Sequence, residues 1–114
     1  MRNVPTFSAS SERRVDAFEA ADLKGGECHD LLVEATEIMY GAWRANGRED
    51  AGTCVLGAGI EVWVVEPRAR AAKPRVVIGQ VSQGNVSSHA AAKPALEFLL
   101  AQGIEARWFD GRMD

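Results

Sequence analysis

The most regular pattern of hydrophobic and polar positions lies between Asp30 and Gly47. Its apolar residues recur at spacings of three and four, which is one face of a helix; they are Leu31, Ala35, Ile38, Met39 and Ala42. Asp30 can serve as the N-cap, and Asn46 with Gly47 supplies a stop signal. The pattern therefore predicts a helix from about Leu31 to Asn46, with its apolar face on the core and its acidic flank in water.

The segment before this helix has a weaker pattern. Residues 1–10 have no period and are rich in Ser, Thr and Pro, so we expect a flexible arm followed by one globular domain over 11–114. Ser10 or Ser11 can cap a short helix that runs through about Leu23 and ends at Gly25 and Gly26.

From Thr53 onwards the chain changes to β-branched residues and glycine. Two apolar runs, 53–56 and 60–66, flank Gly57-Ala58-Gly59. This is typical of either a tight hairpin or one long strand with a glycine bulge. The next run, 75–83, predicts a further strand, which we expect to pair antiparallel with the strand that contains Val64.

The final third of the chain predicts a helix and a last strand. Ser87 or Ser88 can cap a helix that ends near Gln102, although Pro94 allows the alternative that regular helix begins only there. Residues 104–109 alternate like a strand, and 110–114 form a short tail. The last strand can lie beside the strand near Ile78 or beside the one near Val64.

These elements predict an α+β fold in the order α-α-β-β-α-β. We expect a three- to four-stranded mixed or antiparallel sheet with two to three helices packed on one face. The 114 residues, 46% of them hydrophobic and 25% charged, suit one globular domain.

Charge divides the chain into two halves. Residues 1–66 carry 12 acids and 6 bases, and 67–114 carry 7 bases and 4 acids, so −6 and +3 give the net −3. An acidic total makes nucleic acid an unexpected partner. We expect no membrane partner and a cytoplasmic location, since no apolar run resembles a signal peptide or approaches the length of a spanning helix.

One loop is nonetheless strongly basic. Between Pro67 and Arg75 lie Arg68, Arg70, Lys73 and Arg75, which could contact phosphate or an acidic partner. No aromatic side chain is interleaved to stack on bases, so a solvated loop is the favoured interpretation.

Candidate catalytic and metal-binding groups are few. Cys28 and His29 are adjacent and so point about 100° apart on a helix, with Cys54 and His89 as possible additions. Glu34 and Glu37 can share a helix face, but a solvated acidic surface explains them better. The Gly57 motif lacks the third glycine and the helix of a dinucleotide site. We therefore predict no catalytic residue, no metal and no cofactor.

Tryptophan is frequent for a chain of this size. Trp43, Trp63 and Trp108 lie on three predicted elements, and a cluster of them beside Glu61 or Glu105 can line a pocket for a cationic or aromatic ligand. Ordinary core packing is the alternative. A cross-strand ion pair between Arg107 and Glu61 would explain those charges equally well.

No family is recognised from the sequence. Residues 90–96 superficially resemble the last helix of double-stranded-RNA-binding domains, but the basic helix start is missing and an extra strand follows. The interpretation that remains is a small non-catalytic binding or protein-interaction module, expected to be a homodimer. The alternatives are a small-molecule binding protein or small enzyme with a Trp-lined pocket, and nucleic-acid binding through the basic loop.

Overall fold

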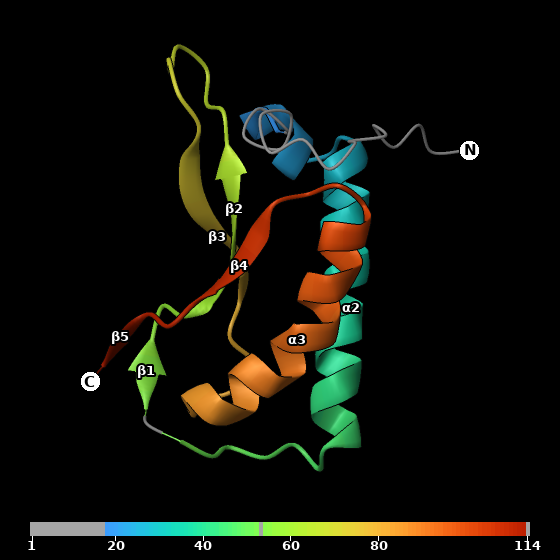
Figure 1. The fold of residues 1–114 in the computed structure, drawn as a ribbon, viewed down its shortest axis with the longest axis vertical. Coiled ribbons are helices and arrows are strands. Elements are labelled where there is room, and N and C mark those ends of the chain that lie inside the picture. Colours follow the sequence, from blue (N-terminus) through green and yellow to red (C-terminus); the bar gives the residue numbers. More distant parts are fainter. Residues whose placement is uncertain (1–17, 53, 114) are drawn as a thin grey trace.

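The computed structural model describes residues 18–52 and 54–113. In Figure 1 two long helices run side by side and lie against one side of a small sheet. In chain order the elements are η1 (Ala20–Leu23), α2 (Glu27–Ala45), β1 (Val55–Leu56), β2 (Gly59–Val64), β3 (Lys73–Gly79), α3 (Asn85–Ala101), β4 (Ala106–Phe109) and β5 (Arg112–Met113).

Helix α2 confirms the strongest helical pattern of the sequence. It begins one turn earlier than predicted, because Gly26 and not Asp30 is the N-cap. Its end follows the Asn46 and Gly47 signal: Gly47 has φ +79°, and the Arg48 N–H donates to the Trp43 carbonyl at 2.9 Å. The positive φ of Gly47 and this hydrogen bond are the features of a Schellman motif, which satisfies the last backbone carbonyls of the helix.

The predicted first helix is confirmed only as a short helix at its end, and its predicted extent is wrong over Phe18 and Glu19. Glu19 is extended and bridges in parallel to Val65, with the Ala20 N–H donating to the Val65 carbonyl at 3.1 Å. Only the four-residue 3₁₀ helix η1 follows. Phe18 is buried in the core. The strand-like pairing of Glu19 with Val65 places it there, and not the apolar face of a helix. Residues 10–17 and the predicted arm lie outside the described residues.

The main sheet has the strand order β3-β2-β4, with β2 antiparallel to both neighbours. The predicted hairpin of β2 and β3 is confirmed, although β3 takes in Lys73 and Arg75 from the predicted loop. The last strand lies beside β2, opposite Gly59 to Val62. Helix α3 therefore connects two parallel strands that have β2 between them.

Gly57 to Gly59 do not form a hairpin. β1 pairs with β5 in a two-stranded sheet and β2 pairs with β4 in the main sheet, both in the same antiparallel register, with Leu56 opposite Arg112 and Gly59 opposite Phe109. The segment therefore follows the long-strand interpretation with an interruption at Gly57 and Ala58, but the register does not shift at the glycines. The register shift lies instead between Ile60 and Glu61, opposite Val77. Part of the predicted tail is thus strand, and Gly111 turns the chain into it with φ +72°.

Helix α3 runs through Pro94 without a break, so the alternative start at Pro94 is wrong. The proline removes one helix hydrogen bond, and four fully buried residues of the same helix offset this loss: Ala91, Ala92, Ala95 and Leu99. Ser87 and Ser88 lie inside the helix and are buried, because their hydroxyls bond to neighbouring loops: Ala51 donates to Ser87 Oγ at 2.7 Å, and Ser88 donates to the Ser82 carbonyl at 2.9 Å.

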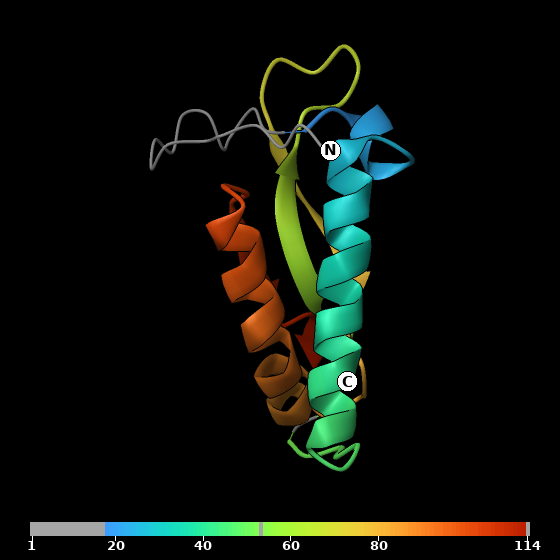
Figure 2. The ribbon, with the colours of Figure 1, turned by 90° about the vertical axis from the view of Figure 1, so that its right-hand side faces the viewer.

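Both long helices cover the same face of the sheet, as Figure 2 shows from the helix side. Ile60, Val62 and Val64 of β2 are 0–1% exposed and join the helix residues in one core. The α+β class, the element order and the placement of the helices on one face are therefore confirmed. None of the helices within the described residues is long and apolar enough to cross a membrane.

Candidate functional site: the open face of the sheet

The face of the sheet that points away from the helices carries the most concentrated set of unassigned side chains. Side chains alternate along a strand, so Glu61 and Trp63 of β2 point to this open face. The register places Val76 and Pro74 of β3 beside them, and Arg107 and Phe109 of β4 on the other side. Among the described residues, no helix lies over these side chains (Figure 1).

An ion pair lies at the centre of the open face. The Arg107 Nε donates to Glu61 Oε1, which confirms the predicted cross-strand pair. The Glu61 side chain is only 7% exposed, whereas that of Arg107 is 60% exposed. A carboxylate that has lost most of its water needs such a partner, because an unpaired buried charge is costly.

Trp63 extends this ion pair into a stack. The guanidinium carbon of Arg107 lies 4.9 Å from the centroid of the Trp63 ring, a distance at which a cation is attracted to an aromatic face. Arg107 is therefore held on two sides, by a carboxylate and by an indole. The result is an ordered, partly exposed surface and not a loosely solvated charge.

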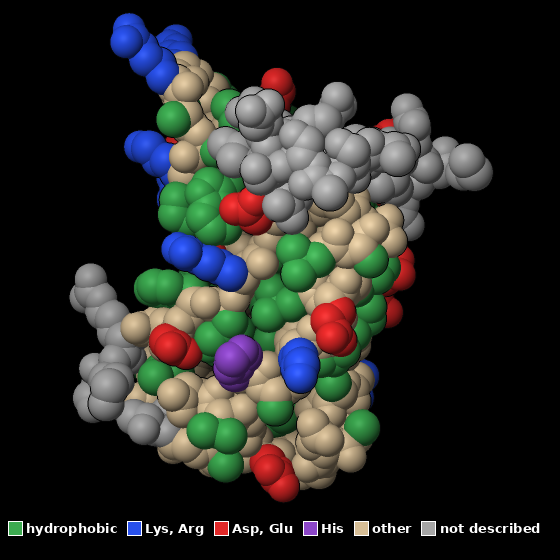
Figure 3. All heavy atoms as spheres, in the orientation of Figure 1, with side chains coloured by type: hydrophobic (Ala, Val, Ile, Leu, Met, Phe, Trp, Pro, Cys, Tyr) green, Lys and Arg blue, Asp and Glu red, His purple; other side chains and the backbone are tan. Residues whose placement is uncertain are grey.

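Apolar side chains flank the ion pair. Val76 is 40% and Phe109 is 41% exposed. Gly59 makes room for Val76: a Cβ added there would lie 2.7 Å from Val76 Cγ1 and 2.1 Å from the Ile78 carbonyl. In Figure 3 hydrophobic and basic side chains alternate down this margin of the molecule, at the left.

The predicted tryptophans are not gathered at one place. Trp108 is opposite Ile60 and so lies on the helix side, where it stacks on His89 with ring centroids 5.5 Å apart and donates to Asp110 Oδ1 at 2.8 Å. Trp43 lies at the end of α2. Of the predicted ligand set, Glu61 and Trp63 share the open face, and Glu105 comes just before β4.

Val76 and Phe109 are the members of this surface that sequence reasoning missed. Val76 begins the continuous apolar run Val76-Val77-Ile78, and Phe109 directly follows Trp108, so alternation does not assign either residue to a face. Only the pairing of the strands decides which residues are covered by the helices.

The basic residues divide between a turn and a strand. Arg68 and Arg70 lie in the loop beyond β2, whereas Lys73 and Arg75 belong to β3, and Arg75 forms an ion pair with Glu66. Arg68 has φ +68° at the third position of the turn from Glu66 to Ala69, where the Ala69 N–H donates to the Glu66 carbonyl at 2.9 Å. Glycine is the preferred residue at this position of the turn, because other residues are strained at a positive φ. The backbone of Arg68 therefore carries strain.

Cys28 is the cysteine candidate at the start of α2. Cys28 is buried in the first turn of α2, and this burial, together with the charges of Asp22 and Glu27, raises the pKa of its thiol to about 12. The thiolate is the nucleophile, so this cysteine is held in its unreactive form at neutral pH. Within the described residues, no group of three or more His, Cys, Asp or Glu side chains is placed to hold a metal ion.

Comparisons with known proteins do not extend this description. No protein-family model matches the chain, and no curated protein or solved structure is similar to it at a significant level.

Proposed function

We propose that this protein is a non-catalytic interaction module that pairs with a second copy of itself through the open face of its sheet. The observation that carries the proposal is the combination of Trp63, Val76 and Phe109 on one face, around the Arg107 and Glu61 ion pair. Contiguous apolar patches bordered by charge are typical of protein–protein contacts.

The size of the face indicates a weak dimer. Three strands about 4.8 Å apart and six residues long span roughly 300 Å², whereas a standard interface buries about 800 Å² on each partner. The second copy must therefore also contact the surroundings of the sheet, which are the β2–β3 tip at one end and the β1–β5 ribbon at the other (Figure 1).

Charge favours one of the two ways to stack the sheets. Arg68 and Arg70 lie at the tip beyond Val64, and Lys73 is opposite Val64. Asp110 follows Phe109, which pairs with the other end of β2. If the strands of the two copies run antiparallel across the interface, the basic tip of each copy lies at the Asp110 end of its partner and away from the partner's own basic tip. The parallel arrangement would place the two basic tips together and cost like-charge repulsion.

A charge placed on the open face tests the proposal. Val76→Lys is expected to weaken dimerisation about tenfold or more, because it would bury an unpaired ammonium against a two-fold copy of itself. Val33→Lys is the matched control, since Val33 is 43% exposed on α2, away from this face. Sedimentation velocity over a concentration series, at low and at high salt, measures both variants.

The expected result is a reversible dimer of the wild type and of Val33→Lys that weakens with salt. A wild-type protein that stays monomeric at the highest soluble concentration in low salt would refute the proposal. Equal dimerisation of Val76→Lys and Val33→Lys would show that the dimer uses another surface.

A further inference from the structure

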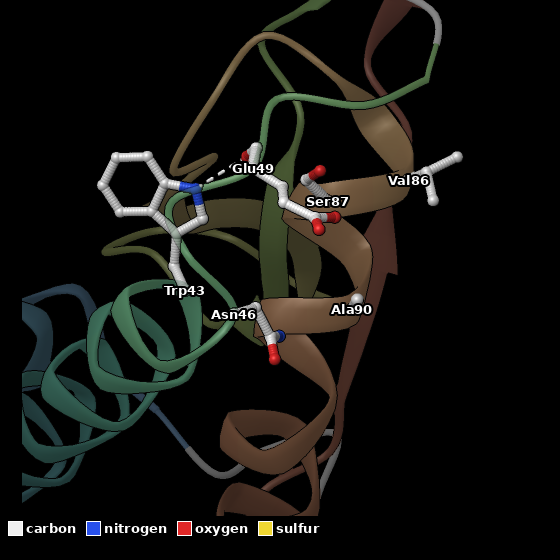
Figure 4. A pocket seen from close by; sticks show the side chains of 6 residues that line it. All are labelled: Trp43, Asn46, Glu49, Val86, Ser87 and Ala90. Atoms are coloured by element: carbon white, nitrogen blue, oxygen red, sulfur yellow. Dashed lines mark hydrogen bonds between the residues drawn. The ribbon is translucent and has the colours of Figure 1, made fainter.

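A pocket lies between the end of α2 and the start of α3, and Trp43 is the one residue of the predicted ligand set that lines it. It has a volume of about 170 Å³ and is lined by Trp43, Asn46, Glu49, Val86, Ser87 and Ala90. Figure 4 shows side chains from both helices and from the connecting loop around it. The pocket is remote from the open face of the sheet, so it stands apart from the proposed dimer.

Hydrogen bonds hold the walls of this pocket in place. The Trp43 Nε1 donates to the Glu49 carbonyl at 2.9 Å, as the dashed line in Figure 4 marks. Beyond Glu49, the Gly84 N–H donates to Asp50 Oδ1 at 2.6 Å. These hydrogen bonds, called the latch below, hold the loop after α2 to the start of α3 and to Trp43. The walls of the pocket are therefore held in place without a ligand.

Hydrogen bonds to the same loop also occupy the backbone N–H groups that would attract an anion. The N–H groups of Val86 and Ser87, in the first turn of α3, donate to the Ala51 carbonyl at 3.1 and 3.2 Å. A helix N-terminus binds anions through such N–H groups. Here the Ala51 carbonyl already accepts from both N–H groups, so they are not available to bind an anion.

The remaining lining favours a cation. Glu49 is the one charged side chain among the six lining residues, and within the described residues its carboxylate has no hydrogen-bond or ion-pair partner. The Asn46 amide adds an acceptor oxygen. Trp43, Val86 and Ala90 provide aromatic and apolar surface for the carbon part of a ligand.

The volume limits the ligand to a small one. A cavity of about 150 Å³ holds a benzene molecule, so about 170 Å³ accommodates a head group of similar size. We infer that this pocket binds the head group of a small organic monocation with N–H donors, such as an alkylammonium, with Glu49 as its counter-charge. The free amine and the side chain of a lysine share this chemistry.

Glu49→Gln removes the charge and leaves the latch intact, because Trp43 bonds to the backbone carbonyl of residue 49. Glu37→Gln is the matched control: it has the same change of charge, at an exposed position of α2 that does not line the pocket. Ala90→Leu is a second variant, which fills the pocket without touching any latch hydrogen bond.

The experiment is an NMR titration of the folded protein with n-butylammonium, followed by the Trp43 indole N–H and the Ser87 and Ala90 amides. We expect saturable shifts that 1-butanol does not reproduce, binding about tenfold weaker in Glu49→Gln and lost in Ala90→Leu, and no change in Glu37→Gln. Blocked lysine identifies the source: tighter binding than n-butylammonium indicates a protein side chain, and equal or weaker binding indicates a free amine.

Three results would overturn the inference. One is the absence of saturable shifts with n-butylammonium and with blocked lysine in the wild type. Another is equally strong binding of 1-butanol, which would make the pocket apolar and not cation-selective. The third is an equal loss in Glu49→Gln and Glu37→Gln, which would reduce the effect to net charge. A dispersed spectrum of each variant verifies that it is folded.

Discussion

The two faces of strand β2 differ sharply although their residues alternate along six positions. On the helix side, Ile60, Val62 and Val64 are at most 1% exposed and contain no polar group in their side chains. On the other side, Glu61 and Trp63 hold a mostly exposed arginine between partly exposed apolar neighbours. The helix-side face of the strand therefore belongs to the core and stabilises the fold. The other face is held in place by its own side-chain contacts, and no helix of the described residues covers it.

The difference shows where binding capacity lies in this molecule. A fully packed face cannot accept a partner without unfolding, because its side chains already fill the space between the layers. The open face retains exposed apolar area and, at its centre, an ion pair between a buried carboxylate and an exposed guanidinium. We therefore expect substitutions on the two faces to act on different properties, stability on one and association on the other.

The largest expected effect comes from a substitution on the face of β2 that the helices cover. Ile60→Ala should lower the free energy of unfolding by about 2–5 kcal/mol, because it leaves a cavity among the helices. Val76→Ala, on the open face, should lower it by less than about 1 kcal/mol. Urea unfolding of the two variants measures both values. Similar losses in the two variants would mean that the faces do not differ in packing as described.

A pair of glycines sharpens the comparison at the edge of the open face. Gly59 and Gly79 are directly paired across β2 and β3. A Cβ on Gly59 would lie 2.1 Å from the Ile78 carbonyl, whereas one on Gly79 would meet nothing within 4 Å. Gly59→Ala should cost about 1–3 kcal/mol through overpacking, and Gly79→Ala should be neutral or stabilising by up to about 1 kcal/mol.

Thermal unfolding of both alanine variants checks this expectation. The contrasting outcome would be an equal loss, which would indicate that any side chain at this pair disturbs the strand and that the space beside Val76 is not the cause.

The smallest expected effect concerns the tip that borders the open face. Arg68→Gly should raise the free energy of unfolding by about 0.5–1 kcal/mol, because glycine adopts the left-handed conformation of Arg68 without strain. Arg70→Gly, which removes the same charge, should not stabilise the protein. Both should weaken a salt-dependent dimer, so stability and association separate. A loss of stability in Arg68→Gly would show that its side chain supports the turn.

Local patterns predicted the elements well where one short-range signal dominates. The three- and four-residue spacing of Leu31 to Ala42 and the Asn46-Gly47 stop predicted α2 and its end, since both depend on residues within one turn of each other. The prediction failed where local signals compete. Ser87 and Ser88 have the chemistry of N-caps, yet the Ser87 hydroxyl accepts from Ala51, 36 positions away, and the Ser88 hydroxyl donates to the Ser82 carbonyl in the loop before the helix.

The candidate site was predictable only in part. Glu61, Trp63 and Arg107 were named from alternation and opposite charge, but Val76 and Phe109 were not. The tryptophans were expected to cluster, yet the register places Trp63 and Trp108 on opposite faces of the sheet. The sequence indicated only Trp43 of the pocket beside Glu49, because its walls come from two helices whose relative position depends on the Asp50 and Ala51 contacts with α3.

The sequence by itself determined the α+β class, the order of the elements and the hairpin of β2 and β3. These features depend on hydrophobic period and turn residues, which act over a few positions along the chain. The tertiary structure decided that β4 lies beside β2, that β5 pairs with β1, and that one face of the sheet stays open. Such pairings join residues 44 or more positions apart, from Val62 and Ala106 upwards, and packing of the whole chain selects among them.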